Sequence, residues 1–297
     1  MPYQIAALLA ATCWALSSLI LAEPVRRLGG PRFCRLRMLY VSVVLLVISV
    51  FRNQWDNIEF GDLGLLTLSA IVGLVVGDIG LFTAMARIGP RRTSVLFTTN
   101  APLAALGGVL LFDETLRSWA LLGAVLTVGG VMLAINYGTN QNAQGSIFER
   151  IDGSLKIGVF WAGVGAFGQA AGALAAKPVL DHGADTLSVA SFRVLIATPL
   201  MWLLAKPSDK LAQAPAKEKI LRTDWVRLAA SGTLAMVLGM SFLLYAIGRG
   251  DTGIASILGG TTPVIMLPLL WIATRRLPAL GAWVGAILSI IGIAFMM

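Results

Sequence analysis

Charged residues are scarce in this sequence of 297 residues. Asp, Glu, Lys and Arg make up 13% of the chain, whereas hydrophobic residues make up 57%, and the mean hydropathy is +0.81. Ordinary soluble domains carry roughly one-quarter charged residues. The shortage of charge therefore excludes an ordinary soluble fold and predicts an integral membrane protein.

Histidine and cysteine are almost absent, which removes most of the side chains that bind metals or act as nucleophiles. The single histidine, His182, follows Asp181 in a predicted loop, and the two cysteines, Cys13 and Cys34, lie in or beside predicted spans. No nucleophile motif, phosphate loop or metal-ligand spacing occurs. The sequence predicts no cofactor, no metal site, no disulfide framework and no catalytic residues.

Long loops are also lacking, because hydrophobic runs fill most of the chain. A helix needs about 20 apolar residues to cross a hydrocarbon core of roughly 30 Å. The runs are apolar around most of their circumference and rich in Gly and Ala, whereas the strands of a membrane barrel would alternate with period two. The sequence predicts an all-α integral membrane fold of about ten transmembrane helices. These helices are expected near residues 3–22, 33–51, 63–86, 93–112, 118–137, 157–176, 187–205, 226–247, 252–273 and 279–296.

The basic residues are distributed unevenly over the predicted loops. Eighteen of the 23 Lys and Arg follow odd-numbered spans, four follow even-numbered spans, and Arg193 lies inside the seventh span. By the positive-inside rule the odd loops face the cytoplasm, which leaves both termini outside. The net charge of +8 is scattered without interleaved aromatic residues, so it indicates a membrane surface and not a nucleic-acid partner.

The second half of the sequence repeats the first. Segment 77–87 (GDIGLFTAMAR) aligns with segment 239–249 (GMSFLLYAIGR), and segment 99–102 (TNAP) aligns with segment 260–263 (GTTP). Because five spans separate the two copies, the second copy enters the membrane from the opposite side. Inverted repeats are typical of secondary transporters, in which a central cavity opens to each side in turn. The expected organisation is a five-helix repeat at 1–137, a linker at 138–156 and an inverted five-helix repeat at 157–297.

This arrangement resembles the ten-helix, EamA-type members of the drug/metabolite transporter superfamily. The resemblance is carried by the Arg-Ile-Gly-Pro-Arg-Arg turn at 87–92, by Pro102 in the fourth span, by the Asp113-Glu114 pair that closes this span, and by the glycine-rich fifth span. It implies a secondary transporter of the cytoplasmic membrane that exports amino acids or related small metabolites without ATP. The family habit of keeping both termini in the cytoplasm opposes the charge count, so both orientations stay open here.

The two halves differ at the acidic end of this signature. Thr274-Arg275-Arg276 stands where the second half would carry the counterpart of Glu114. A symmetric role for Glu114 is therefore doubtful, and a position at a span end makes Asp113 and Glu114 solvated or helix-terminal residues by default.

Asp78 is the strongest candidate for a functional residue. A carboxylate inside a span costs roughly 2.5–3.5 kcal/mol on insertion scales, so it should face the bundle interior or a wet cavity. It could bind a proton or a cationic group. The structural alternative is a carboxylate that pairs with an arginine such as Arg37 or Arg193.

Arg193 follows the same logic with the opposite charge. It could bind a substrate carboxylate or phosphate through two parallel hydrogen bonds. Arg37 is its rough counterpart in the second span, although both side chains are long enough to reach the membrane surface.

Further polar residues within the spans are candidates to line a substrate cavity. Each has a structural alternative, because Trp often marks the membrane interface, and Ser or Thr often bonds to the backbone of its own helix. Pro102 and Pro263 are candidate hinges, since proline removes one helical hydrogen bond. The cavity candidates besides Asp78 and Arg193 are Trp14, Ser18, Gln169, Thr99, Asn100, Tyr245, Thr261 and Thr262.

Functions of other classes remain as alternatives. A membrane-embedded enzyme would have to work without any recognisable catalytic motif, and a channel would need a selectivity filter or a charged ring, which the sequence does not display. A receptor or scaffold has no obvious use for an inverted repeat. The sequence therefore favours a transporter whose partners are a small-molecule substrate and the lipid bilayer, with protons as a further partner if Asp78 is protonated and deprotonated during transport.

Overall fold

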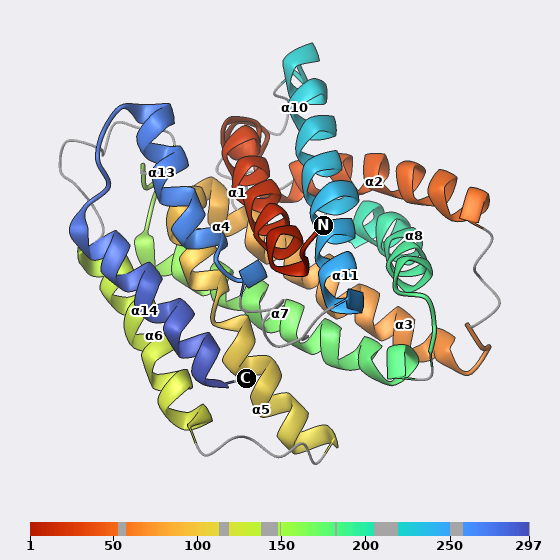
Figure 1. Cartoon of the computed structure of the whole chain (residues 1–297). Coiled ribbons are helices and arrows are strands. Elements are labelled where there is room, and N and C mark those ends of the chain that lie inside the picture. The colour runs from red at the N-terminus through yellow and green to blue at the C-terminus, as the bar shows by residue number, and fades with distance from the viewer. Residues whose placement is uncertain are drawn as a thin grey trace.

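The computed structural model describes residues 1–52, 58–112, 119–137, 148, 150–181, 183–204, 219–249 and 258–296. Within these residues the chain is almost entirely helical and contains no strand. The predicted all-α fold is confirmed. The helices cross one another at varied angles and form one bundle (Figure 1).

The elements of the first half are α1 (Tyr3–Leu28), α2 (Gly30–Arg52), α3 (Asp62–Ser69), η1 (Ala70–Val76), α4 (Gly77–Phe97), α5 (Asn100–Phe112) and α6 (Ala120–Tyr137). Those of the second half are α7 (Leu155–Asp181), α8 (Thr186–Leu204), α10 (Arg222–Gly232), η3 (Thr233–Gly239), α11 (Met240–Arg249), α13 (Thr262–Thr274) and α14 (Leu280–Met296). η1 and η3 are π-helical segments that continue directly into the α-helices on both sides.

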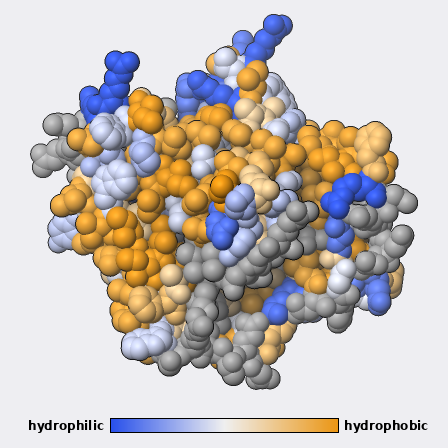
Figure 2. Space-filling view, viewed as in Figure 1, coloured by the Kyte–Doolittle hydropathy of each residue, from blue (hydrophilic) through white to orange (hydrophobic). Residues whose placement is uncertain are grey.

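Apolar helices account for all ten predicted spans. In the described part of the chain, five helical stretches are long and apolar enough to cross a membrane, and five more apolar helices are shorter. Many large apolar side chains are exposed on the outside of the bundle. Figure 2 shows hydrophobic residues over much of the visible face, with hydrophilic ones at the top, where α10 and α13 end in Figure 1, and along the right edge. This outer surface is the one that a lipid bilayer covers.

Glycines make the sharp turns between neighbouring spans. Gly29 (φ 78°) separates α1 from α2, and Gly89 (φ 81°) lies inside the continuous stretch Asp62–Phe97. Both have the positive φ that residues with a Cβ rarely adopt. The carbonyl group of Phe148 also lies where a side chain on Gly89 would begin. Gly89 therefore divides this stretch into the predicted third span and the start of the fourth.

The two halves share irregular segments at equivalent places. η1 precedes Gly77 in the third span, and η3 occupies the matching place in the eighth span and ends at Gly239. The fourth span is interrupted by a turn at Thr98 and Thr99, and the ninth by a turn at residues 260–261. Since an irregularity in one half has a counterpart in the other, the repeat seen in the sequence is also a structural repeat.

The fifth and tenth spans show the symmetry most directly. α6 and α14 lie side by side (Figure 1). The hydroxyl of Thr127 donates to the carbonyl oxygen of Ser289 at 3.4 Å, and the hydroxyl of Ser289 donates to the carbonyl oxygen of Thr127 at 3.4 Å. These two residues are separated by the same 162 positions as Gly77 and Gly239. Such a reciprocal contact places the two-fold axis between the halves at this pair.

Candidate functional site

Glycines bring α4 and α7 close enough to enclose Asp78. A Cβ on Gly168 would stand 2.6 Å from Cα of Gly77, and a Cβ on Gly172 would stand 2.5 Å from Cα of Gly73. Close backbone approach through small residues is typical of helices packed in membranes. It leaves Asp78, next to Gly77, facing α7 at the centre of the bundle.

Asp78 is almost completely buried, with 3% of its surface exposed. Gln169 on α7 donates a hydrogen bond of 3.5 Å from Nε2 to Oδ1 of Asp78. The guanidinium groups of Arg37 and Arg193 are both within electrostatic reach of the carboxylate. The structure therefore brings together three of the cavity candidates, namely Asp78, Gln169 and Arg193, with Arg37, which was considered as a partner of Asp78.

The two arginines lie on opposite sides of Asp78 along the third span. Cζ of Arg37 lies 5.1 Å from the ring centroid of Phe82, one helical turn after Asp78. Nη2 of Arg193 lies 2.8 Å from the point where a Cβ on Gly73 would stand, five residues before Asp78. The carboxylate thus occupies the middle of a row that runs along the third span in the order Arg193, Asp78, Arg37.

Arg37 and Arg193 are equivalent residues of the two repeats. Arg37 lies seven residues after Gly30, the start of α2, and Arg193 lies seven residues after Thr186, the start of α8. Both begin a similar run, Arg-Met-Leu-Tyr-Val-Ser and Arg-Val-Leu-Ile-Ala-Thr. At 1.5 Å per residue each arginine is roughly 10 Å inside its helix, too deep for its backbone to be at the surface.

Asp78 itself has no acidic counterpart. Its equivalent in the second half, 162 residues later, is Met240. One carboxylate therefore faces two symmetric cations, which makes this cluster the point where the two halves differ most in charge.

Trp14 and Tyr245 belong to a second group of contacts. The indole nitrogen of Trp14 donates a 3.0 Å hydrogen bond to the carbonyl oxygen of Ala235 in η3 and packs against Gly239. The hydroxyl of Tyr245 donates to the carbonyl oxygen of Met1 at 3.1 Å. Ser18 donates to the carbonyl oxygen of Trp14 in its own helix, which is the structural role weighed for it above. This group joins the first span to the eighth.

The hydroxyls beside the two helix breaks satisfy backbone carbonyls. Thr99 donates to Leu96, Thr261 to Leu258 and Thr262 to Gly259, each three residues back. These bonds replace helical bonds that the turns interrupt. Asn100 begins α5 and is partly buried.

Pro102 and Pro263 lie in the first turns of the helices that follow these breaks. α5 begins at Asn100, two residues before Pro102, and α13 begins at Thr262, one residue before Pro263. In the first turn a proline removes no helical hydrogen bond, because the N–H there has no partner within the helix. The interruption therefore precedes each proline.

Ion pairs close the end of the bundle that carries the odd loops. Arg26 of α1 pairs with Asp152, which precedes α7, and Arg27 pairs with Asp224 of α10. Glu23 pairs with Arg227, also of α10. The pairs of Arg27 and Glu23 join the first span to the second half of the chain, and the pair of Arg26 joins it to the linker. Asp152 also anchors the linker, because its backbone N–H donates to the carbonyl oxygen of Arg87 at 2.7 Å.

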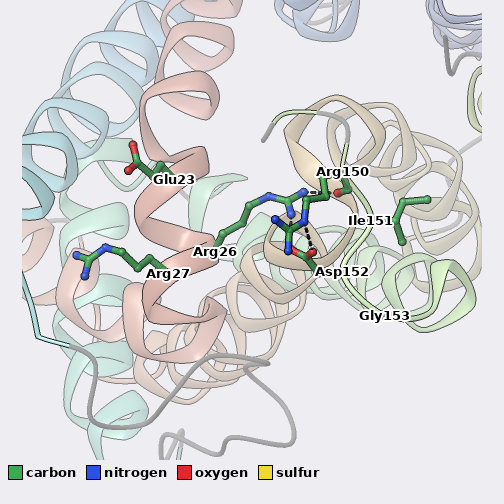
Figure 3. A pocket seen from close by; sticks show the side chains of 7 residues that line it. All are labelled: Glu23, Arg26, Arg27, Arg150, Ile151, Asp152 and Gly153. Atoms are coloured by element: carbon green, nitrogen blue, oxygen red, sulfur yellow. Dashed lines mark hydrogen bonds and ion pairs between the residues drawn. The ribbon is translucent and has the colours of Figure 1, made fainter. Parts of the chain in front are cut away.

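A polar cavity of about 680 Å³ lies among these ion pairs. Figure 3 shows Arg26 reaching from α1 toward Arg150 and Asp152, with Glu23 and Arg27 on the same helix. The residues that line it are Glu23, Arg26, Arg27, Arg150, Ile151, Asp152 and Gly153. Its walls therefore come from the first span and the linker, at the mouth of the bundle.

The sequence of the chain matches a known family over both halves. The sequence model of the EamA-like transporter family matches residues 1–136 and again residues 156–297. The chain belongs to the EamA-like transporter family. It is therefore a multi-pass membrane protein and a transporter of small molecules.

The fold of this EamA-like transporter is also found in a solved structure. That structure, described only as the crystal structure of a protein, is 19% identical, with a TM-score of 0.65 over 99% of this chain and 95% of its own. At this identity the likeness shows the fold alone. None of the curated proteins compared with this EamA-like transporter matches it significantly.

Sequence reasoning named Arg37 as a partner for Asp78 and as the counterpart of Arg193, but left it out of the cavity candidates because its side chain is long enough to reach the membrane surface. It missed the contact of Arg27 with Asp224, since no sequence pattern pairs residues so far apart. His182, Asp113 and Glu114 lie outside the described residues.

Proposed function

We propose that this protein is a secondary transporter of the cytoplasmic membrane that exports amino acids or related metabolites by alternating access, with Asp78 as the site of proton coupling. The observation that carries the proposal is the burial of Asp78 between two arginines, at the contact of the third span with the sixth. A membrane-buried carboxylate is costly and usually belongs to a substrate or proton pathway.

The ion pairs at the odd-loop end support an alternating mechanism. They join α1 to α10 and to the start of α7, so one mouth of the bundle is held shut by contacts between the halves. The exposed pair of Glu23 with Arg227 is weak and exchanges readily, whereas the pair of Arg27 with the buried Asp224 is stronger and breaks only when the two halves move apart. Such contacts can break when the halves rock and the other mouth closes.

The paired irregularities supply places where the spans can bend. η1 and η3 leave the regular helical bonding pattern in the third and eighth spans, and the turns at residues 98–99 and 260–261 interrupt the fourth and ninth. π-helical segments and discontinuous helices are frequent at functional sites of membrane proteins. η1 ends two residues before Asp78, which favours a transport site at this cluster.

The test is uptake into proteoliposomes from a panel of labelled amino acids, sugars and nucleosides, with and without a pH gradient. We expect gradient-driven uptake of a compound from the amino acid class. Asp78→Asn removes the proton site but preserves the shape of the side chain. It should abolish the dependence on the gradient while downhill exchange continues.

The outcomes separate the parts of the proposal. Equal gradient dependence in the native chain and Asp78→Asn would exclude Asp78 as the coupling site. Chemical change of a compound without its movement across the membrane would favour an enzyme. Binding without either movement or turnover would favour a receptor.

A further inference from the structure

The charges of the buried cluster do not balance. Arg37 and Arg193 contribute two positive charges, and Asp78 contributes one negative charge. The nearby side chains of Gln169 and Phe82 are neutral, as is the buried thiol of Cys34. An uncompensated charge away from water is strongly unfavourable, so a buried cation normally has an anionic partner.

Three polar atoms of this cluster also lack hydrogen-bond partners. Within the described part of the chain, Oδ2 of Asp78, Nε of Arg37 and Nε of Arg193 are buried without any partner. Buried polar atoms are satisfied in the great majority of cases, and an exception calls for an explanation. The Nε–H groups of Arg37 and Arg193 have no acceptor, and the cluster carries a net positive charge. Both observations indicate that the cluster binds a negatively charged hydrogen-bond acceptor.

We propose that Arg37 and Arg193 together bind an oxyanion group of the transported compound, a carboxylate or a phosphate, and that Asp78 competes with this group for the two guanidinium groups. The inference rests on the proposed transport function and adds the class of substrate to it. Arginine suits this task because its planar fork binds an oxyanion through two parallel hydrogen bonds. Asp78 and Arg37 are only 3% and 5% exposed, whereas Arg193 and Gln169 are partly exposed, so the carboxylate is buried while the Arg193 side of the site borders accessible space.

The competition links the oxyanion to the proton. When the oxyanion neutralises the two guanidinium groups, Asp78 loses their electrostatic attraction within a buried site. A carboxylate in that position is stabilised by a proton. Binding of the anion and protonation of Asp78 therefore favour each other, so the anion and the proton cross together and export runs down the concentration gradient of the compound.

The experiment measures the unfolding temperature of the purified full-length chain in detergent at constant ionic strength. Chloride is replaced stepwise by acetate, succinate or inorganic phosphate. We expect a saturable rise in unfolding temperature with at least one of these oxyanions, and a preference for phosphate or for the carboxylates tells which group the site accepts. Arg37→Gln and Arg193→Gln should each raise the half-saturating concentration about tenfold or more, since each removes charged hydrogen bonds.

Asp78→Asn should have the opposite effect. It removes the competing carboxylate, so the half-saturating concentration should fall, and the double variant Asp78→Asn/Arg193→Gln should return it toward the native value. Arg52→Gln is the matched control on α2, because Arg52 is exposed at the far end of that helix and pairs only loosely with Asp185 at 3.7 Å. Arg193→Lys keeps the charge if the Gln variant does not fold, and should bind with intermediate strength.

Three results would overturn the inference: no saturable effect in the native chain, equal effects in the native chain and the arginine variants, or weaker binding in Asp78→Asn. The binding measurement needs no transport, so it separates this inference from the proposed function. Oxyanion binding without any uptake would contradict the transport proposal alone. Uptake restricted to compounds without a carboxylate or phosphate would contradict this inference and the amino acid class, but not transport itself.

Discussion

At the residue scale, ion pairs of similar geometry differ in how deeply their side chains are buried. Glu23 and Arg227 pair with each other, and their side chains are 51% and 40% exposed. In the pair of Arg27 with Asp224, the side chain of Asp224 is only 4% exposed. Asp224 also accepts a 2.7 Å hydrogen bond from the backbone N–H of Leu221, which caps α10. The buried carboxylate should therefore matter more to stability than the exposed one.

Asp224→Asn is expected to lower the free energy of unfolding by about 1.5–3 kcal/mol, the usual range for a hydrogen bond to a charged group. Glu23→Gln should lower it by about 0–1 kcal/mol, because water screens an exposed pair. Unfolding in detergent micelles, followed by tryptophan fluorescence, measures both. A larger loss in Glu23→Gln than in Asp224→Asn would contradict the assignment.

At the scale of the helices, packing depends on which glycines face a neighbouring helix. On α7, a Cβ at Gly168 would stand 2.6 Å from Cα of Gly77 and 2.8 Å from the carbonyl oxygen of Val72. A Cβ at Gly163 on the same helix would meet nothing within 4 Å. The first glycine holds α7 against the third span, and the second faces open space.

Gly168→Ala should push α7 away from α4 and lower the free energy of unfolding by about 1–3 kcal/mol, as overpacking commonly does. The same shift would draw Gln169 away from Asp78 and slow transport. Gly163→Ala is the matched control and should be neutral or stabilising by up to about 1 kcal/mol, because Ala favours helix more than Gly does. Thermal unfolding and uptake rates of both variants test this, and equal losses in the two would show that helix contact is not the cause.

Membrane orientation is a property of the whole molecule. The odd-loop end of the bundle carries most of the basic residues, which favours its placement in the cytoplasm. The ends of the chain then lie outside. Two exposed positions report on the two faces, Arg276 at the odd-loop end and Glu59 at the even-loop end.

Arg276→Cys should be protected from a membrane-impermeant thiol reagent in intact cells and react after the membrane is opened. Glu59→Cys should react in intact cells. The native Cys13 and Cys34 are buried and should give little background. Labelling in the reverse pattern would place both termini in the cytoplasm.

Much of the fold follows from local properties of the sequence. The length and composition of each apolar run fix the number of spans, and the match of the two halves fixes the inversion, because five is an odd number of crossings. Asp78 and Arg193 could be recognised alone, since any charge within an apolar run needs an interior partner.

The tertiary structure alone decided which residues meet. Arg27 and Asp224 are 197 positions apart, and Arg37, Asp78 and Arg193 come from three different spans, so their contacts depend on how each helix is rotated and crossed against the others. The winding of η1 adds to this, because i to i+5 bonding brings Asp78 more nearly onto the face of Gly73 than α-helical winding would. No local pattern encodes such rotations, since they follow from the close approach of glycine-lined backbones that are distant in the sequence.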